Sequence, residues 1–227
     1  MLRAGRVNSV TVAPERRLVL QRRIRWIVAG TIAYNVIEAV VAIAAGTVAS
    51  SAALVAFGLD SVVEVLSAAA VAWQFTRRDP ERYERATLRV IAIAFFALAG
   101  YVTVTSVLSL TGAVDARHST VGIVLAAVSL LVMPALSLLE RRTGLELGSA
   151  TAVADSKQTL ICSYLSAAVL IGLVLNSTLG WSWADPVAGL VIAGFAVREG
   201  IEAWRGDACA TPIGMLLEGE EGHGHDH

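Results

Sequence analysis

The sequence predicts an all-α membrane protein built from six transmembrane helices. Of its 227 residues, 56% are hydrophobic and 16% are charged, whereas a soluble domain typically carries about 25% charged residues. The charged residues gather in short segments between apolar stretches of roughly 20 residues, the length at which a helix crosses a bilayer. The first apolar stretch follows a long basic segment and contains Asn35 and Glu38. We therefore expect it to be a retained helix rather than a cleaved signal peptide.

Each predicted span ends where turn-forming or charged residues interrupt the apolar pattern. The breaks are a small-residue turn after Gly46, the charged segment RRDPERYER, a polar segment before His118, a charged segment with Gly144, and a turn rich in Gly, Ser and Trp. Trp181 and Trp183 in the last turn favour a membrane interface. The predicted spans are 24–46, 52–75, 88–110, 119–139, 149–175 and 184–204.

The basic residues alternate between the two sides of the predicted membrane. Arginines are frequent before the first span, between the second and third spans, after the fourth and at the end of the sixth, whereas the other loops hold only Arg117. Because short loops rich in arginine stay in the cytoplasm, both termini are expected there. This orientation requires an even number of spans, in agreement with six.

The rest of the composition narrows the class of protein. The net charge of −1 gives no basic surface for nucleic acid, and Cys162 and Cys209 are too few for a disulfide framework. No soluble domain is expected. We divide the chain into a basic cytoplasmic segment (1–23), a transmembrane domain (24–206) and a cytoplasmic tail (207–227).

Asp60 and Glu64 are the clearest functional candidates. They lie four residues apart in the second span, and therefore on one helix face. An acidic side chain at the centre of a membrane helix costs about 2.5–3.5 kcal/mol on insertion scales. Their span contains no basic residue, so a divalent cation or a proton is the natural compensator. The alternative is a polar helix contact in which burial keeps one carboxylate neutral.

The fifth span carries a second group of candidate ligands. Asp155, then Gln158 or Thr159, and then Cys162 follow one helix face. Cysteine and carboxylate side chains bind transition metals well, and an amide oxygen binds them more weakly. For Cys162 alone, the alternative is a small hydrophobic residue in the core.

The first span contributes Asn35 and Glu38, for which hydrogen bonding between helices is the alternative to an accessory role at the site. The depth of each candidate residue in the membrane follows from its distance to the predicted cytoplasmic end of its span, at about 1.5 Å per residue. Asp155 lies about two turns closer to the cytoplasm than Cys162, as an entrance residue would. The residues that share one level are Asn35, Glu38, Asp60, Glu64, Gln158 and Cys162.

With these residues in view, the sequence resembles the cation diffusion facilitator family over residues 24–206. The second span, SSAALVAFGLDSVVEVLSAA, is similar to the family's second helix, where two metal ligands lie four residues apart. The sixth, GWSWADPVAGLVIAGFAVREGIEAWRG, is similar to its W-x-D-P…A helix. The resemblance implies a six-helix bundle, a homodimer, and Asp60 and Glu64 as metal ligands.

The fifth span, GSATAVADSKQTLICSYLSAAVLIG, resembles the family pattern A-D-x-x-H-x-x-x-D and departs from it. Asp155 matches the upstream Asp, Gln158 stands where His is expected, and Cys162 stands where the second Asp is expected. The metal-sensing domain of many members is also missing from the expected organisation. These departures bear on metal selectivity and on transport itself.

The tail ends in GHGHDH, and the imidazoles of His223, His225 and His227 can bind Zn²⁺ or similar ions. The alternatives are a solvated tail or a purification artefact.

Together these residues predict a multi-pass protein of a bacterial-type cytoplasmic membrane that exports a divalent cation in exchange for protons. Zn²⁺ is the favoured ion, with Fe²⁺, Mn²⁺, Co²⁺ and Cd²⁺ as alternatives, and no permanent cofactor is expected. Burial penalises the charged carboxylates, so that protons compete with the metal. One alternative is a metal-binding or assembly protein that does not transport; another is a transporter of a different cation or a proton-coupled solute. An enzyme is not expected, because the spans contain no catalytic triad, phosphate loop or hydrolase-type His pair.

Overall fold

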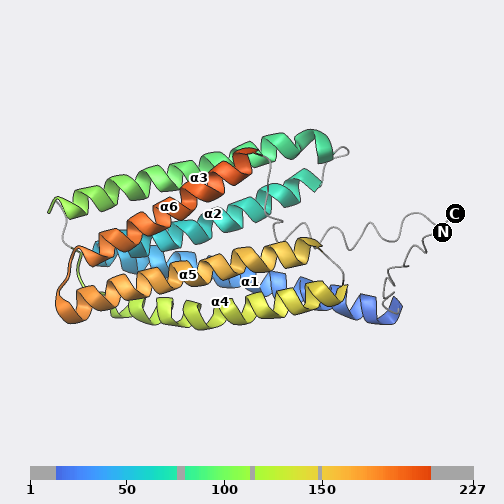
Figure 1. Cartoon of the computed structure of the whole chain (residues 1–227), viewed down its shortest axis with the longest axis horizontal. Helices are drawn as coiled ribbons and strands as arrows, with labels where there is room; N and C mark the ends of the chain where they lie inside the picture. Colours follow the sequence, from blue (N-terminus) through green and yellow to red (C-terminus); the bar gives the residue numbers. More distant parts are fainter. Residues whose placement is uncertain (1–13, 76–79, 113–115, 148–149, 206–227) are drawn as a thin grey trace, which may run out of the picture.

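The computed structural model describes residues 14–75, 80–112, 116–147 and 150–205, and in this part it consists of six α-helices and no strand. The helices run back and forth along one elongated bundle (Figure 1). This confirms the all-α prediction. The elements are α1 (Pro14–Ala49), α2 (Ala52–Phe75), α3 (Pro80–Leu110), α4 (Thr120–Leu147), α5 (Ala150–Leu179) and α6 (Ala184–Arg205).

Five of these helices, α1 to α5, are long and apolar enough to cross a membrane. The sixth, α6, is shorter and carries five charged side chains within 22 residues, namely Asp185, Arg198, Glu199, Glu202 and Arg205. Its apolar residues still pack into the same bundle, where its small residues face α2, α3 and α5.

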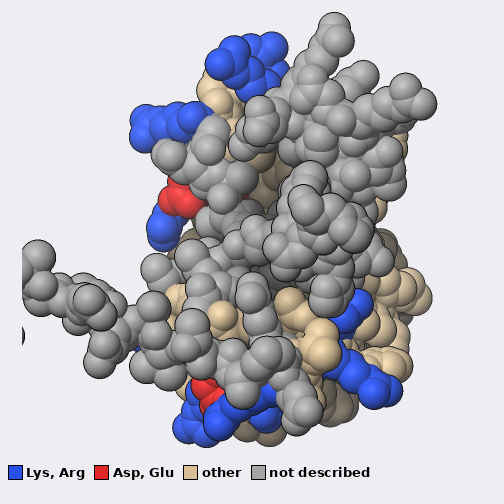
Figure 2. Space-filling view, turned by 90° about the vertical axis from the view of Figure 1, so that its right-hand side faces the viewer, with Lys and Arg blue, Asp and Glu red and all other residues tan. Residues whose placement is uncertain are grey.

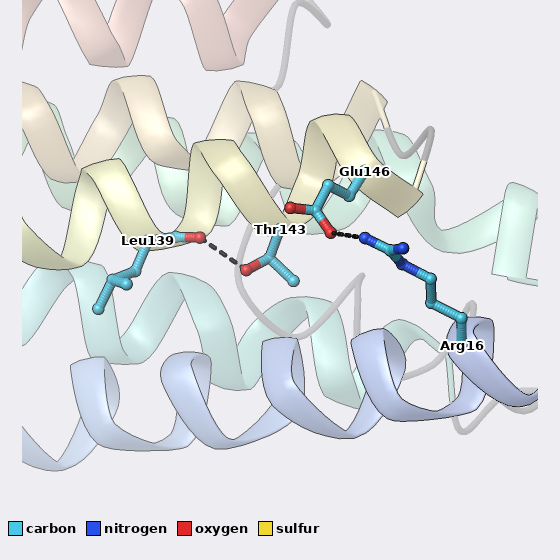
Figure 3. Close-up of polar contacts among 4 residues, drawn as sticks. All are labelled: Arg16, Leu139, Thr143 and Glu146. Carbon is cyan, nitrogen blue, oxygen red and sulfur yellow. Dashed lines mark hydrogen bonds and ion pairs between the residues drawn. The ribbon is translucent and has the colours of Figure 1, made fainter. Parts of the chain in front are cut away.

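Four helices, α1, α3, α4 and α5, extend past the limits expected for them. The helix α3 begins at Pro80, eight residues before its predicted span, and α5 ends at Leu179, four residues after it. The helix α1 begins at Pro14, ten residues before the predicted span, and proline is well suited to the first turn of a helix. The expected break at 140–146 is wrong, because α4 continues to Leu147. Outside a bilayer core, charged residues continue a helix without cost, and here Arg16 of α1 pairs with Glu146 of α4 at 3.3 Å (Figure 3).

The helix α2 occupies the centre of the bundle. It contacts α1, α3, α5 and α6, while the most extensive contacts join α4 to α5, α3 to α6 and α1 to α2. In Figure 1, α3 and α6 lie together on one side and α4 and α5 on the other. The acidic pair of α2 therefore lies in the middle of the molecule rather than against lipid.

The start of α2 is tied to α6 through Asp185. The Ser51 hydroxyl accepts a hydrogen bond from Leu54 N–H at 3.0 Å, as a helix cap does, and donates to Asp185 Oδ1 at 2.5 Å. Asp185 Oδ2 accepts from Ala53 N–H at 3.4 Å. A buried carboxylate at a helix N-terminus is favourable because the helix dipole is positive there. We therefore assign Asp185 a structural role.

Among the described side chains, the arginines concentrate at one end of the bundle. We call this the arginine-rich end; α1, α3 and α5 begin there and α2, α4 and α6 end there (Figure 1). Figure 2 looks onto this end and shows the basic groups around it. The exception is Arg117 at the opposite end, whose backbone N–H donates to Ala49 O at 2.8 Å. The arginines at the arginine-rich end are Arg16, Arg22, Arg23, Arg25, Arg85, Arg89, Arg141, Arg142, Arg198 and Arg205.

Candidate metal site

The helices α2 and α5 bring Asp60, Glu64 and Cys162 together. One ligand atom from each of the three lies within 4.8 Å of the others. Asp60 and Cys162 are buried and Glu64 is half-buried. Typical zinc–ligand distances imply separations of roughly 3.3–3.8 Å between tetrahedral ligand atoms. Small side-chain rotations are thus enough to close these three ligands, here called the triad, around a cation.

Glu64 links the triad to α1. Its Oε1 accepts a hydrogen bond from Cys162 Sγ at 2.6 Å, and its Oε2 accepts one from Asn35 Nδ2 at 2.7 Å. Asn35 is 6% exposed, and its Oδ1 has no hydrogen-bond partner among the described residues. An amide oxygen can coordinate a metal ion as a neutral ligand. Asn35 thus stays a predicted accessory ligand, now placed in contact with Glu64.

Glu38 belongs to a different group of contacts. Its two carboxylate oxygens accept hydrogen bonds from Ser61, at 2.8 Å, and from Ser129. Because Ser129 has a single hydroxyl proton, Tyr34 is the donor in the 2.6 Å contact between Tyr34 and Ser129. Glu38 thus joins α1 to α2 and α4 by hydrogen bonds.

A further buried acid, Glu140, was missed by the sequence reasoning. It is fully buried, and it accepts hydrogen bonds from Thr31 at 3.3 Å and from Thr159 at 3.0 Å. Thr31 precedes Asn35 by four residues and Thr159 precedes Cys162 by three, so Glu140 lies one helical turn from the triad toward the arginine-rich end.

A signal for Glu140 was present in the sequence. The predicted fourth span ended at its first charged residue, yet the small and polar positions of α4 continue through it at helical spacing. The buried residues of this face are Gly122, Ala126, Ser129, Met133, Ser137, Glu140, Thr143 and Gly144.

For the remaining predicted ligands, the structure describes no side chain. Asp155 and Gln158 belong to α5, but their side chains are not described, and the same holds for all of His223, His225 and His227. Their roles as ligands stay predictions.

Comparisons with known proteins identify the family of the chain. A profile described as the cation efflux transmembrane domain matches residues 30–205, which are 176 of the 227 residues. A cation-efflux pump, FieF, from Shewanella oneidensis is 34% identical over 86 residues, or 38% of this chain. The matched segment covers 29% of that pump. On the strength of the domain match, the chain belongs to the cation efflux family of membrane transport proteins.

Proposed function

We propose that the protein exports a divalent metal cation, with Zn²⁺ as the preferred ion, in exchange for protons. The observation that carries this proposal is the triad of Asp60, Glu64 and Cys162 in the interior of the bundle. Two carboxylates and a thiol form a ligand set of intermediate softness, which suits Zn²⁺ and Cd²⁺ better than Mg²⁺ or Ca²⁺.

The contact between Cys162 and Glu64 supports the coupling to protons. The thiol hydrogen points to a Glu64 oxygen at 2.6 Å, whereas the metal ligand is the thiolate. An arriving cation must therefore displace that proton, and a returning proton weakens the hold on the cation. Helix movements that expose the triad to each side in turn convert this competition into antiport.

The placement of the arginines supports a cytoplasmic arginine-rich end, by the tendency of basic loops to stay inside. In this arrangement both termini lie in the cytoplasm of a bacterial-type cell, and the His-containing tail collects cations on that side. We propose that the protein acts as a homodimer, as the family resemblance implies.

A second candidate function is metal binding without transport. It is favoured by the cysteine at a position where the family pattern has aspartate, because a thiolate holds Zn²⁺ tightly and slows its release. This candidate predicts cation binding that does not lead to flux.

Flux measurements in vesicles separate the two functions. The purified protein is reconstituted with a zinc-sensitive dye inside, and a panel of divalent ions is offered with and without a proton gradient. The double variant Asp60→Ala with Glu64→Ala should lower the rate of Zn²⁺ flux at least about 100-fold, since each charged ligand contributes about 1.5–3 kcal/mol. Glu146→Gln, at an exposed ion pair, is the matched control and should transport normally. Unchanged flux in the double variant rules out the proposed site, and binding without flux in the wild type favours the second candidate.

A further inference from the structure

The side chain of Glu199 on α6 is buried, and the functional site described above does not include it. Glu199 is 8% exposed, and its Oε1 is buried without a hydrogen-bond partner among the described residues. The neighbouring acid on the same helix, Glu202, is paired at the surface with Arg198 at 2.9 Å. A buried carboxylate oxygen without a hydrogen-bond donor loses its hydration without compensation, which raises the free energy of the folded protein. A bound ligand would remove this cost.

The packing of α6 on α2 gives the level of Glu199 in the bundle. A Cβ placed on Gly189 would lie 3.5 Å from Ala53 N, so these residues mark one level of two helices that run in parallel. Glu199 lies ten residues beyond Gly189, and Val63 lies ten residues beyond Ala53. Glu199 is therefore level with Val63, beside Glu64.

The packing of α6 on α5 gives the same level independently. A Cβ placed on Gly172 would lie 2.9 Å from Ala188 Cβ, and these two helices run in opposite directions. Glu199 lies eleven residues after Ala188, and Ile161, the neighbour of Cys162, lies eleven residues before Gly172. Glu199 and Ile161 are therefore at the same level of the two helices. Eleven residues complete about three helical turns, so Glu199 shares the face of Ala188 and points toward α5.

Asp60 lies within electrostatic reach of this group. The acids that act on Asp60 are Glu64, Glu38 and Glu199, which concentrates negative charge around one buried carboxylate. Glu199 is nevertheless not one of the three residues whose ligand atoms lie within 4.8 Å of one another. It is close to the triad and distinct from it.

We propose that Asp60 and Glu199 form a second position for the divalent cation, beside the triad. This inference rests on the proposed function and adds α6 to the site. The second position has oxygen ligands alone, whereas the triad includes sulfur. Asp60 is a ligand in both positions. An ion can therefore move from the triad to the pair of Asp60 and Glu199 while it stays bound to Asp60.

Cadmium titration of the purified full chain tests the second position, because a Cd²⁺–thiolate bond absorbs in the ultraviolet and a Cd²⁺–carboxylate bond does not. Bound ions are counted by equilibrium dialysis. Glu199→Gln should bind one ion fewer than its matched control Glu202→Gln, with the absorption band intact. All proteins compared carry Cys209→Ala, which leaves Cys162 as the single thiol. In this background Cys162→Ser should lose the band, which assigns the band to the triad. The tail is the same in all variants, so differences between them report on the bundle.

Equal numbers of ions in Glu199→Gln and Glu202→Gln would overturn the second position, and so would loss of the thiolate band in Glu199→Gln. Failure of the proposed function gives a different result. The variant with Asp60→Ala and Glu64→Ala would then bind as many ions as the wild type, and no protein in the series would show the thiolate band. Size-exclusion profiles and melting curves of each variant establish that it is folded.

Discussion

At the scale of single residues, the acids inside the bundle divide into those held by hydroxyl and backbone N–H donors and those that gather around the triad. Glu38 accepts from two serines, Glu140 from two threonines, and Asp185 from Ser51 and a helix N-terminus. These three carboxylates connect helices. Asp60 instead lies among other acids, and the amide oxygen of the nearby Asn35 has no hydrogen-bond partner among the described residues. We infer that the first group stabilises the fold and that the second group binds the cation.

Glu140 gives a test of the stabilising role. Glu140→Ala should lower the free energy of unfolding by about 1–3 kcal/mol, because the buried contacts that join α4 to Thr31 of α1 and to Thr159 of α5 are lost. Glu146→Ala, on the same helix at an exposed ion pair, should change it by less than about 1 kcal/mol. Reversible unfolding in mixed detergent micelles measures both values. Equal effects of the two substitutions would refute a structural role for the buried carboxylate.

Sequence spacing predicted some of these residues and not others, for a physical reason. The pair Asp60 and Glu64 could be recognised because both lie on one helix, where a separation of four residues fixes their shared face. The partners of Glu140 come from α1 and α5, and no spacing within α4 encodes them. Glu199 was missed for the same reason, since its importance depends on which helices pack against α6.

At the scale of helices, glycines set how closely α2 approaches its neighbours. A Cβ on Gly58 would lie 2.9 Å from both the backbone nitrogen of Ile43 and the Cβ of Ala42. Neither atom belongs to a flexible side chain, so α1 and α2 are in close contact just before Asp60. The sequence predicted α2 with its observed bounds and α1 with a start ten residues too late, but the contact between the two helices required the three-dimensional structure.

Gly58→Ala should therefore separate α1 from α2 and destabilise the protein by about 1–3 kcal/mol, the range for overpacked cores. The affinity for Zn²⁺ should fall as well, because Asp60 follows two residues later and Asn35 lies on the displaced helix. Gly100→Ala is the matched control: a Cβ there meets nothing within 4 Å, and alanine favours a helix over glycine. Melting temperature and zinc affinity are measured for both variants. A Gly58→Ala protein with the stability of Gly100→Ala would show that the close contact is not required.

At the scale of the whole molecule, the bundle is asymmetric from end to end. Among the described side chains, ten arginines lie at the arginine-rich end and Arg117 lies at the other. The sequence predicted this asymmetry because loop order and helix count determine which loops share a side. It could not predict that α1, α3, α4 and α5 continue as helices beyond the expected spans. The length of an apolar stretch reflects the thickness of the membrane and not the length of the helix.

The end-to-end asymmetry predicts the orientation in the membrane. In a background with Cys162→Ala and Cys209→Ala, a new cysteine at His118, exposed at the end opposite the arginines, should react with a membrane-impermeant maleimide in intact cells. A cysteine at Glu146, exposed at the arginine-rich end, should react only after the cells are permeabilised, because basic loops remain in the cytoplasm. The two positions are matched in exposure to solvent and differ in the end of the bundle that they report. The reverse labelling pattern would place the arginines outside the cell, and the direction proposed for cation export would then be wrong even if the triad binds the ion.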